Sequence, residues 1–387
     1  MGLSACTETS LYQDEPSKGR QIQFTLSPIK GGATRASEGY TAFDQNQTFG
    51  TTAFALDAAK TWKDATNPNS TTASLSDISD TEITGKEISC QNSVWKAWSE
   101  NKSYYWDDFE GKKLTFLSWS PCSLGVSTGS TTAKLTISED TKDFAYTGWT
   151  MSATAGYGYK KNAEGKYERN TDDGSVDLLL AKSTDCDPAN SSTGVLTQFV
   201  HQLCNIKFAA LILDEPDKDD NGKYLNEWHI TKVELSDIYT QADLLKAATP
   251  TVNTQIWDNH TAASTYTYTP ETPIDLVYDS EFNLTEIFPQ TLMLPQLVLA
   301  TSTTDADGNK VERTPKITIT YTDINNEEKK LVGALATNTT TDLTTWLAGK
   351  SITYKISIST KEYYIDFDAD VDTWKDGDDT TINIGSK

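Results

Sequence analysis

Cys6 is the first residue of the chain whose surroundings indicate covalent chemistry. It ends the segment Leu3-Ser4-Ala5-Cys6, in which an apolar residue and two small residues precede the cysteine. This is the pattern of a lipobox, whose cysteine carries diacylglycerol, and an attached lipid anchors a chain to a membrane. The residues before Cys6 lack the basic start and apolar stretch of a signal peptide, so we expect the precursor to have a longer leader. Gly2 myristoylation with Cys6 palmitoylation fits less well, and an ordinary cysteine is the remaining alternative.

A second reaction is indicated near Arg35, as a site of proteolysis. Gly31-Gly32-Ala33-Thr34-Arg35 is a linker of small residues that ends in a single basic residue. Only four of the 33 basic residues are arginines, namely Arg20, Arg35, Arg169 and Arg313. A protease that cuts after arginine therefore has few sites, and the sequence favours the linker.

The three histidines do not form a catalytic or metal-binding pattern. His201 lies in Phe199-Val200-His201-Gln202-Leu203, where alternation predicts a half-buried strand and a hydrogen-bonded structural histidine. His229 and His260 are surrounded by polar and turn residues, without a second ligand at metal spacing.

Two motifs match known sites only in part. Gly125-Val126-Ser127-Thr128-Gly129 has the letters of a nucleophile elbow, but the required helix is replaced by a predicted strand, 133–137. The segment 217–222 begins like a calcium-binding loop, but Trp228 stands where a bidentate glutamate is needed. The sequence thus predicts no enzyme activity, no metal site and no cofactor.

The remaining cysteines are Cys90, Cys122, Cys186 and Cys204. Their spacings match no metal-binding pattern, and an even number allows two disulfides in three pairings. Four isolated thiols that act as small apolar core residues are the favoured interpretation.

Composition excludes some partners. The net charge of −22 and the isoelectric point near 4.5 argue against nucleic acid and anionic lipid headgroups, which repel an acidic surface. No apolar run is long enough to span a membrane as a helix. The 10 Trp, 17 Tyr and 12 Phe residues can supply much of a hydrophobic core.

Alternating apolar and polar residues predict strands along most of the chain. The first is Gln21 to Ser27, with Ile22, Phe24 and Leu26 on one face and Pro28 as its end. Further strands are predicted at 114–119, 133–137, 317–321 and 352–358, and short helices at 243–248 and 342–347. This pattern predicts an all-β fold of antiparallel sandwiches, with a domain boundary in the polar loop 183–192.

The C-terminal segment has one apolar and one acidic face. Its apolar residues are Tyr363, Ile365, Phe367, Ala369 and Val371, and aspartates alternate with them. Trp374 and a short last strand follow, the latter with Ile382 and Ile384. An ordinary edge strand is one interpretation, because charges on an edge discourage stray pairing. A donor strand that enters the groove of another chain is the other.

Two groups of aromatic residues could form a sugar-stacking platform. They are Trp95, Trp98, Tyr104, Tyr105 and Trp106, with Tyr157 and Tyr159. Cross-strand aromatic pairs inside a sandwich are the favoured alternative. A glycan-binding lipoprotein that does not polymerise and a glycoside-active enzyme with paired carboxylates therefore remain as rival functions.

Several segments in order along the chain resemble the fimbrillin family, the type V pilins that Gram-negative gut and oral anaerobes export as lipoproteins. The N-terminal match is Leu3 to Cys6, a strand and then Thr34-Arg35-Ala36. Later matches are the strand 114–119 ending in Ser120-Pro121, the segment 199–208, Trp346 to Tyr354, and Val371 to Gly377.

This resemblance implies a lipidated propeptide (1–35) followed by two transthyretin-like β-sandwich domains, 36–190 and 191–387, without enzymatic activity. It implies that the lipid first anchors the precursor at the outer membrane. A trypsin-like or Arg-specific protease then cuts between Arg35 and Ala36. Release of the plug strand that carries Ile22, Phe24 and Leu26 would then open a groove. The segment 363–384 of another copy, or of a related fimbrial subunit, would fill it and build a surface fimbrium for adhesion.

Overall fold

Strands dominate the structure of this chain, as the alternating sequence patterns predict. The computed structural model describes residues 19–26, 48–62, 86–91, 94–96, 104–124, 127–128, 135–138, 143–170, 172–215, 217–218, 220–222, 228–247, 256–304, 310–323, 325–336, 343–359 and 364–373. Within them, no helix is long and apolar enough to cross a membrane. The predicted all-β fold class is confirmed.

The first sheet has eight strands. In spatial order they are β12 (Val195–Thr197), β1 (Phe24–Leu26), β4 (Val94–Lys96), β3 (Lys86–Gln91), β2 (Thr48–Asp57), β5 (Lys112–Ser120), β11 (Leu179–Cys186) and β13 (Val200–His201). The sheet curls back on itself and brings β11 close to β12, where Ser183 Oγ donates a hydrogen bond of 2.7 Å to the carbonyl of Leu196. A short 3₁₀ helix, η2 (Trp106–Phe109), precedes β5, and η3 (Cys122–Leu124) follows it.

Both faces of the first sheet are covered. Along β5, Leu114 and Phe116 join a cluster inside the curl, which we call the inner core. Leu117 and Trp119 join a second cluster on the opposite face. Because successive side chains of a strand point to opposite faces, one strand serves two cores.

Two further sheets are built mainly from the second half of the chain, and one of them also contains three strands from residues 127–150 of the first half. One contains β22 (Glu328–Ala334), β21 (Lys316–Thr322), β15 (Trp228–Leu244), β8 (Asp143–Thr150), β7 (Leu135–Ser138) and β6 (Ser127–Thr128), with β16 (Trp257–Tyr268) and β17 (Ile274–Leu276) also paired to β15. The other contains β18 (Thr285–Met293), β14 (Cys204–Ile212), β23 (Lys350–Ser359) and β24 (Tyr364–Thr373). Two small hairpins complete the fold, β9 (Tyr159–Lys161) with β10 (Tyr167–Arg169) and β19 (Thr301–Thr304) with β20 (Lys310–Arg313).

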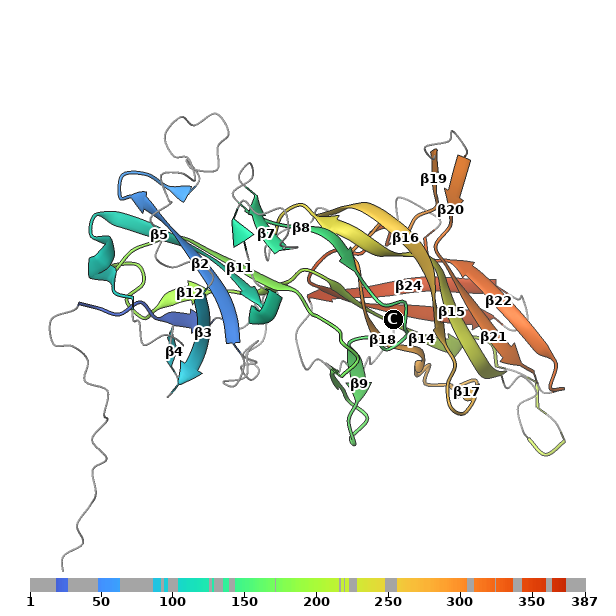
Figure 1. Cartoon of the computed structure of the whole chain (residues 1–387). Coiled ribbons are helices and arrows are strands. Elements are labelled where there is room, and N and C mark those ends of the chain that lie inside the picture. Colours follow the sequence, from blue (N-terminus) through green and yellow to red (C-terminus); the bar gives the residue numbers. More distant parts are fainter. Residues whose placement is uncertain are drawn as a thin grey trace, which may run out of the picture.

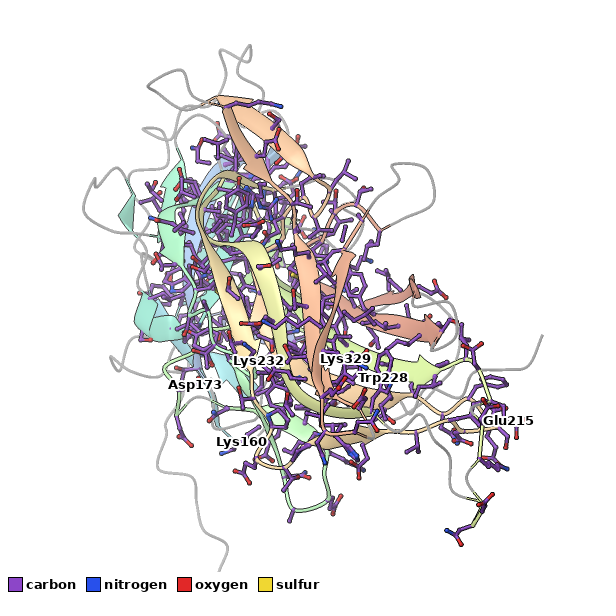
Figure 2. All side chains as sticks on the ribbon, turned by 90° about the vertical axis from the view of Figure 1, so that its right-hand side faces the viewer. Lys160, Asp173, Glu215, Trp228, Lys232 and Lys329 are labelled. Carbon is purple, nitrogen blue, oxygen red and sulfur yellow. The ribbon has the colours of Figure 1, made fainter. Side chains whose placement is uncertain are left out.

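The facing sheets of the second half enclose a third apolar cluster. At its outer end the ring of Trp228 in β15 stacks on Tyr321 in β21, with centroids 3.8 Å apart. Figure 2 looks onto this end of the molecule and labels Trp228 there, together with Lys329 of β22, which lies opposite Tyr321. Most strand pairs are antiparallel, but β1 with β12, β14 with β23 and β6 with β7 are parallel.

The long hairpin of β15 and β16 crosses from the second half of the chain to the first (Figure 1). The N-terminal part of β15 pairs with β21, and its C-terminal part pairs with β8. Leu244 and Trp257 therefore belong to the same cluster as Trp119. The boundary between 190 and 191 lies just before β12 and β13, which pair within the first sheet. The two halves are thus interlocked by strands from both sides of the predicted boundary.

Both predicted short helices are wrong in the described residues. Leu244, in the first, completes β15 and is 1% exposed. Trp346, in the second, exchanges backbone hydrogen bonds with Gln296 in an extended segment and is fully buried. Burial of these large side chains outweighs the weak helix preference of a few residues.

Candidate functional site

The N-terminal strand β1 lies inside the first sheet and not at its margin. It runs parallel to β12, with Phe24 opposite Val195 and Leu26 opposite Thr197. On its other side it is antiparallel to β4, where Phe24 lies opposite Trp95. The strand therefore fills a gap between two neighbours, and its loss would open the sheet at that point.

Backbone hydrogen bonds fix the segment before β1. Ile22 N donates to Tyr104 O at 2.8 Å, and Trp106 N donates to Arg20 O at 2.9 Å. On the β12 side, Val195 N donates to Gln23 O at 2.7 Å. These groups would lose their partners if the strand left, and each buried group left unpaired costs about 1–3 kcal/mol.

The side chains of β1 and of Ile22 just before it complete the inner core. Ile22 is 4% exposed and Phe24 is 6% exposed, whereas Leu26 is half-buried at the rim of the same cluster. The Phe24 ring lies edge-on to Phe49 and Phe116, with centroids 5.6 Å and 5.3 Å away. Burial of Ile22 and Phe24 contributes about 1.5–3 kcal/mol each.

The loop between β11 and β12 forms side-chain hydrogen bonds with β1 and with Arg20 before it. Arg20 Nη2 donates to the carbonyls of Pro188 and Ser191, the latter at 3.2 Å. Thr25 Oγ1 donates to Thr193 O at 2.6 Å. We call these contacts of Arg20 with Pro188 and Ser191 the Arg20 clasp.

Gly194 allows the loop to approach this closely. Its φ is +115°, and a Cβ built there would lie 2.6 Å from Thr25 Oγ1. A larger residue would therefore be strained by its backbone and would collide with the strand.

No sequence pattern indicates this loop as part of the site. Arg20 appears in the sequence only as one of four arginines, and the loop only as part of the polar segment 183–192. The partners of Arg20 lie about 170 residues further along the chain, so no local pattern could reveal the clasp.

The C-terminal strand β24 pairs with β23 of its own chain over ten residues. It is the last strand of its sheet. Ala369 packs against the third cluster, and Val371 is 45% exposed. Lys355 of β23 forms an ion pair of 2.5 Å with Asp370. Ile365 and Phe367 lie in the same strand, but their side chains fall outside the described part.

Several predicted site residues lie outside the described residues altogether. These are Cys6, Arg35, Ala36, Tyr363, Ile382 and Ile384. Lipidation, processing and the far end of the donor segment therefore stay predictions.

Most described members of the aromatic groups are buried, whereas Tyr105 and Tyr157 are half-buried. Tyr104 and Trp106 belong to the inner core, and Tyr159 is 7% exposed in the cluster on the opposite face. Side chains buried in this way cannot stack on a sugar, which weakens the glycan-binding alternative for these residues.

The other residues singled out for chemistry have structural surroundings. His201 is fully buried, and its Nδ1 lies 2.8 Å from Asp177 Oδ2, as expected for a hydrogen-bonded structural histidine. In the part of the chain that is described, Cys122, Cys186 and Cys204 are thiols and not disulfides. The described residues also contain no group of His, Cys, Asp or Glu that could hold a metal ion.

Comparison with known proteins supports the fold. Neither a protein-family model nor a curated protein matches the sequence. A fimbrial protein from Bacteroides vulgatus has a similar structure, with a TM-score of 0.54 and 17% identity over 92% of this chain and 100% of that one. The tip fimbrial protein Mfa3 from Porphyromonas gingivalis gives a TM-score of 0.34 and 9% identity over 85% of this chain and 95% of that one. The comparison with the Bacteroides vulgatus protein shows a shared fold.

Proposed function

We propose that this chain is a structural subunit of surface fimbriae that polymerises by donor-strand exchange. Its precursor is exported as a lipoprotein through Cys6 and held at the outer membrane. A trypsin-like or Arg-specific protease cuts it between Arg35 and Ala36, and the assembled fimbrium promotes adhesion. The position of β1 between β12 and β4 is the observation that carries this proposal.

The energetics of the groove favour replacement of the strand over its simple loss. Removal of β1 takes Ile22 and Phe24 out of the inner core and leaves backbone groups of Tyr104, Trp106 and Val195 without partners. A new strand restores both kinds of interaction. The opened groove therefore has a strong tendency to bind an extended segment with alternating apolar residues.

The donor in this proposal is the segment 363–384 of a second copy or of a related subunit. Among the described residues, β24 is paired on one side only, whereas β1 is paired on both sides. Transfer of an edge strand into a two-sided groove thus exchanges one ladder of hydrogen bonds for two. Because the groove and the donor are different surfaces, such contacts do not close on themselves, and they produce filaments.

Limited proteolysis of the purified chain tests the proposal. Trypsin is expected to convert the precursor to a species that begins at Ala36, and this species is expected to form a ladder of oligomers on native gels. With an Arg-specific protease, Arg35→Ala should block both conversion and assembly. Trypsin does not suit this variant, because it also cuts after Lys30, which lies between the plug strand and residue 35. Arg35→Lys is the matched control, because trypsin still cuts it whereas an Arg-specific protease does not.

Two outcomes would count against this function. A species that begins at Ala36 and stays monomeric at high concentration would exclude self-assembly. Oligomers of the Arg35→Ala variant would show that the cut plays no part. The lipid step is tested separately by Cys6→Ser in the precursor with its leader, which should move the protein from the membrane fraction to the soluble fraction.

A further inference from the structure

The two ends of β1 are held unequally. At the Arg20 end, the clasp to Pro188 and Ser191 adds to the hydrogen bonds of Ile22 with Tyr104 and of Trp106 with Arg20. Ile22 itself is buried at this end.

The Leu26 end is held more weakly. Leu26 is half-buried, and its only strand partner among the described residues is Thr197 of β12. One side-chain hydrogen bond lies next to it, from Thr25 Oγ1 to Thr193 O at 2.6 Å. The register of β4 with β1 stops at Phe24, opposite Trp95. A strand opens most easily where burial is low and hydrogen bonds are few, so β1 should fray from Leu26.

An exposed apolar side chain stands beside this weak end. Leu196 of β12 is 63% exposed, the highest value among the large apolar side chains of the described residues. It lies opposite Thr25, and its neighbours Val195 and Thr197 are fully buried. Leu196 therefore points outward from the strand that an incoming segment has to join.

The predicted cleavage site lies on the same side. Arg35 follows Leu26 in the sequence, whereas the lipid-bearing residues precede Arg20. A cut after Arg35 would free the Leu26 end and leave the Arg20 end attached to the rest of the propeptide.

We propose that strand exchange has a fixed direction and begins at the Leu26 end of β1. A second copy's C-terminal segment first pairs with β12 beside Leu26, so that its apolar face turns towards the inner core and its other face lies beside Leu196. It then displaces β1 residue by residue towards Ile22, and the Arg20 clasp opens last. Stepwise displacement keeps the groove filled, so buried groups are never left unpaired at about 1–3 kcal/mol each. This inference rests on the proposed function and names the contact surface at which the partner arrives.

The rate of release of the propeptide tests this direction. The full chain is cut at Arg35, kept dilute with residues 1–35 still bound, and mixed with a synthetic peptide of residues 361–387. Released propeptide is measured by gel filtration and intact mass. The release rate is expected to rise in proportion to peptide concentration, because the peptide enters before the strand leaves.

Variants at the two ends make the test specific. Leu196→Ser should lower the slope of rate against peptide concentration about three- to tenfold, as expected for loss of contact with part of one leucine side chain. Val332→Ser is the matched control, because Val332 of β22 is also exposed (57%) but lies in the second half. Its slope should equal that of the unchanged protein. Arg20→Gln should accelerate the final release of the propeptide. The effect of Leu196→Ser on the slope should be the same with and without this change.

Three results would overturn the inference, and they are distinguishable. A release rate that does not depend on peptide concentration would mean that β1 leaves first. An unchanged slope in Leu196→Ser would mean that the peptide enters elsewhere. Cut protein that neither releases residues 1–35 nor binds the peptide would contradict the proposed function itself.

Discussion

The ring of Phe24 lies edge-on to the ring of Phe116, with centroids 5.3 Å apart and planes inclined by 85°. One residue belongs to a strand of three residues near the N-terminus, and the other belongs to the central strand β5. The inner core of the first half is therefore completed by a segment that precedes the predicted cleavage site. Stability of this half and retention of β1 are linked through the same contact.

Phe24→Ala should destabilise the uncut chain by about 3 kcal/mol, because it removes a buried aromatic ring from the inner core. Gln23→Ala is the matched control. Its backbone carbonyl still accepts from Val195 N, so the change should stay within about 0.5 kcal/mol. Urea unfolding followed by tryptophan fluorescence measures both. Equal stability of the two variants would show that Phe24 does not hold the inner core together.

The thiol of Cys186 should report whether the groove is filled. Burial raises the pKa of this thiol to about 11, with a further rise from Asp185 and Asp187. Only the thiolate reacts with iodoacetamide, so at pH 8 the filled state should alkylate roughly a hundredfold more slowly than an exposed cysteine. The rate should increase as the pH rises towards 11. Opening of the groove exposes the inner core, and labelling at pH 8 should then become fast.

Peptide mapping after labelling separates Cys186 from the other cysteines. Cys204 is the internal control, because it is fully buried in the third cluster and its pKa is also raised by burial. It should stay unlabelled before and after the cut. Rapid labelling of Cys186 in the uncut chain would contradict the packing of β1 over the inner core.

Arg313→Lys should destabilise the second half by about 2–4 kcal/mol. The Arg313 side chain is buried, and three of its nitrogens donate at 2.7 Å to Asp237 O, Leu297 O and Gln296 Oε1. The guanidinium also lies over the ring of Tyr239, 4.0 Å from its centroid. A lysine ammonium is too compact to reach all three acceptors.

Thermal unfolding of the Arg313→Lys variant measures this loss. Lys310→Arg is a suitable control, because Lys310 lies in the same strand, β20, and its side chain is 69% exposed. If Arg313→Lys and the control had equal melting temperatures, the three hydrogen bonds of the Arg313 guanidinium would not contribute to stability.

The two halves should unfold as one cooperative unit. Trp257 of β16 belongs to the same cluster as residues of the first sheet, and its Nε1 donates to Gln202 O at 2.6 Å. Its ring also lies 6.1 Å from that of Trp149 in β8. Calorimetry is expected to give one transition with equal calorimetric and van't Hoff enthalpies.

Trp257→Ala should lower stability by about 3–5 kcal/mol and separate the two halves into distinct transitions. Two transitions already present in the unchanged chain would refute the interlocked arrangement. If stability falls but no second transition appears, Trp257 contributes to core packing and does not couple the unfolding of the two halves.

Several features of this chain follow from local sequence. Alternation placed strands at 114–119, 317–321 and 352–358, and the structure has β5, β21 and β23 there. The same pattern put Ile22, Phe24 and Leu26 on one face, because the side-chain period of a strand is two. Short-range patterns of this kind depend only on neighbouring residues, so one sequence is enough to read them.

Other features were decided by the tertiary structure. The parallel pairing of β1 with β12, the Arg20 clasp and the passage of β15 into the first half join residues far apart in the chain. Leu244 illustrates the physical reason. Its local sequence favours a short helix, but burial of its side chain in a core that both halves share favours a strand. Strand partners are chosen by the total burial and hydrogen bonding of the folded chain, and no local pattern contains that sum.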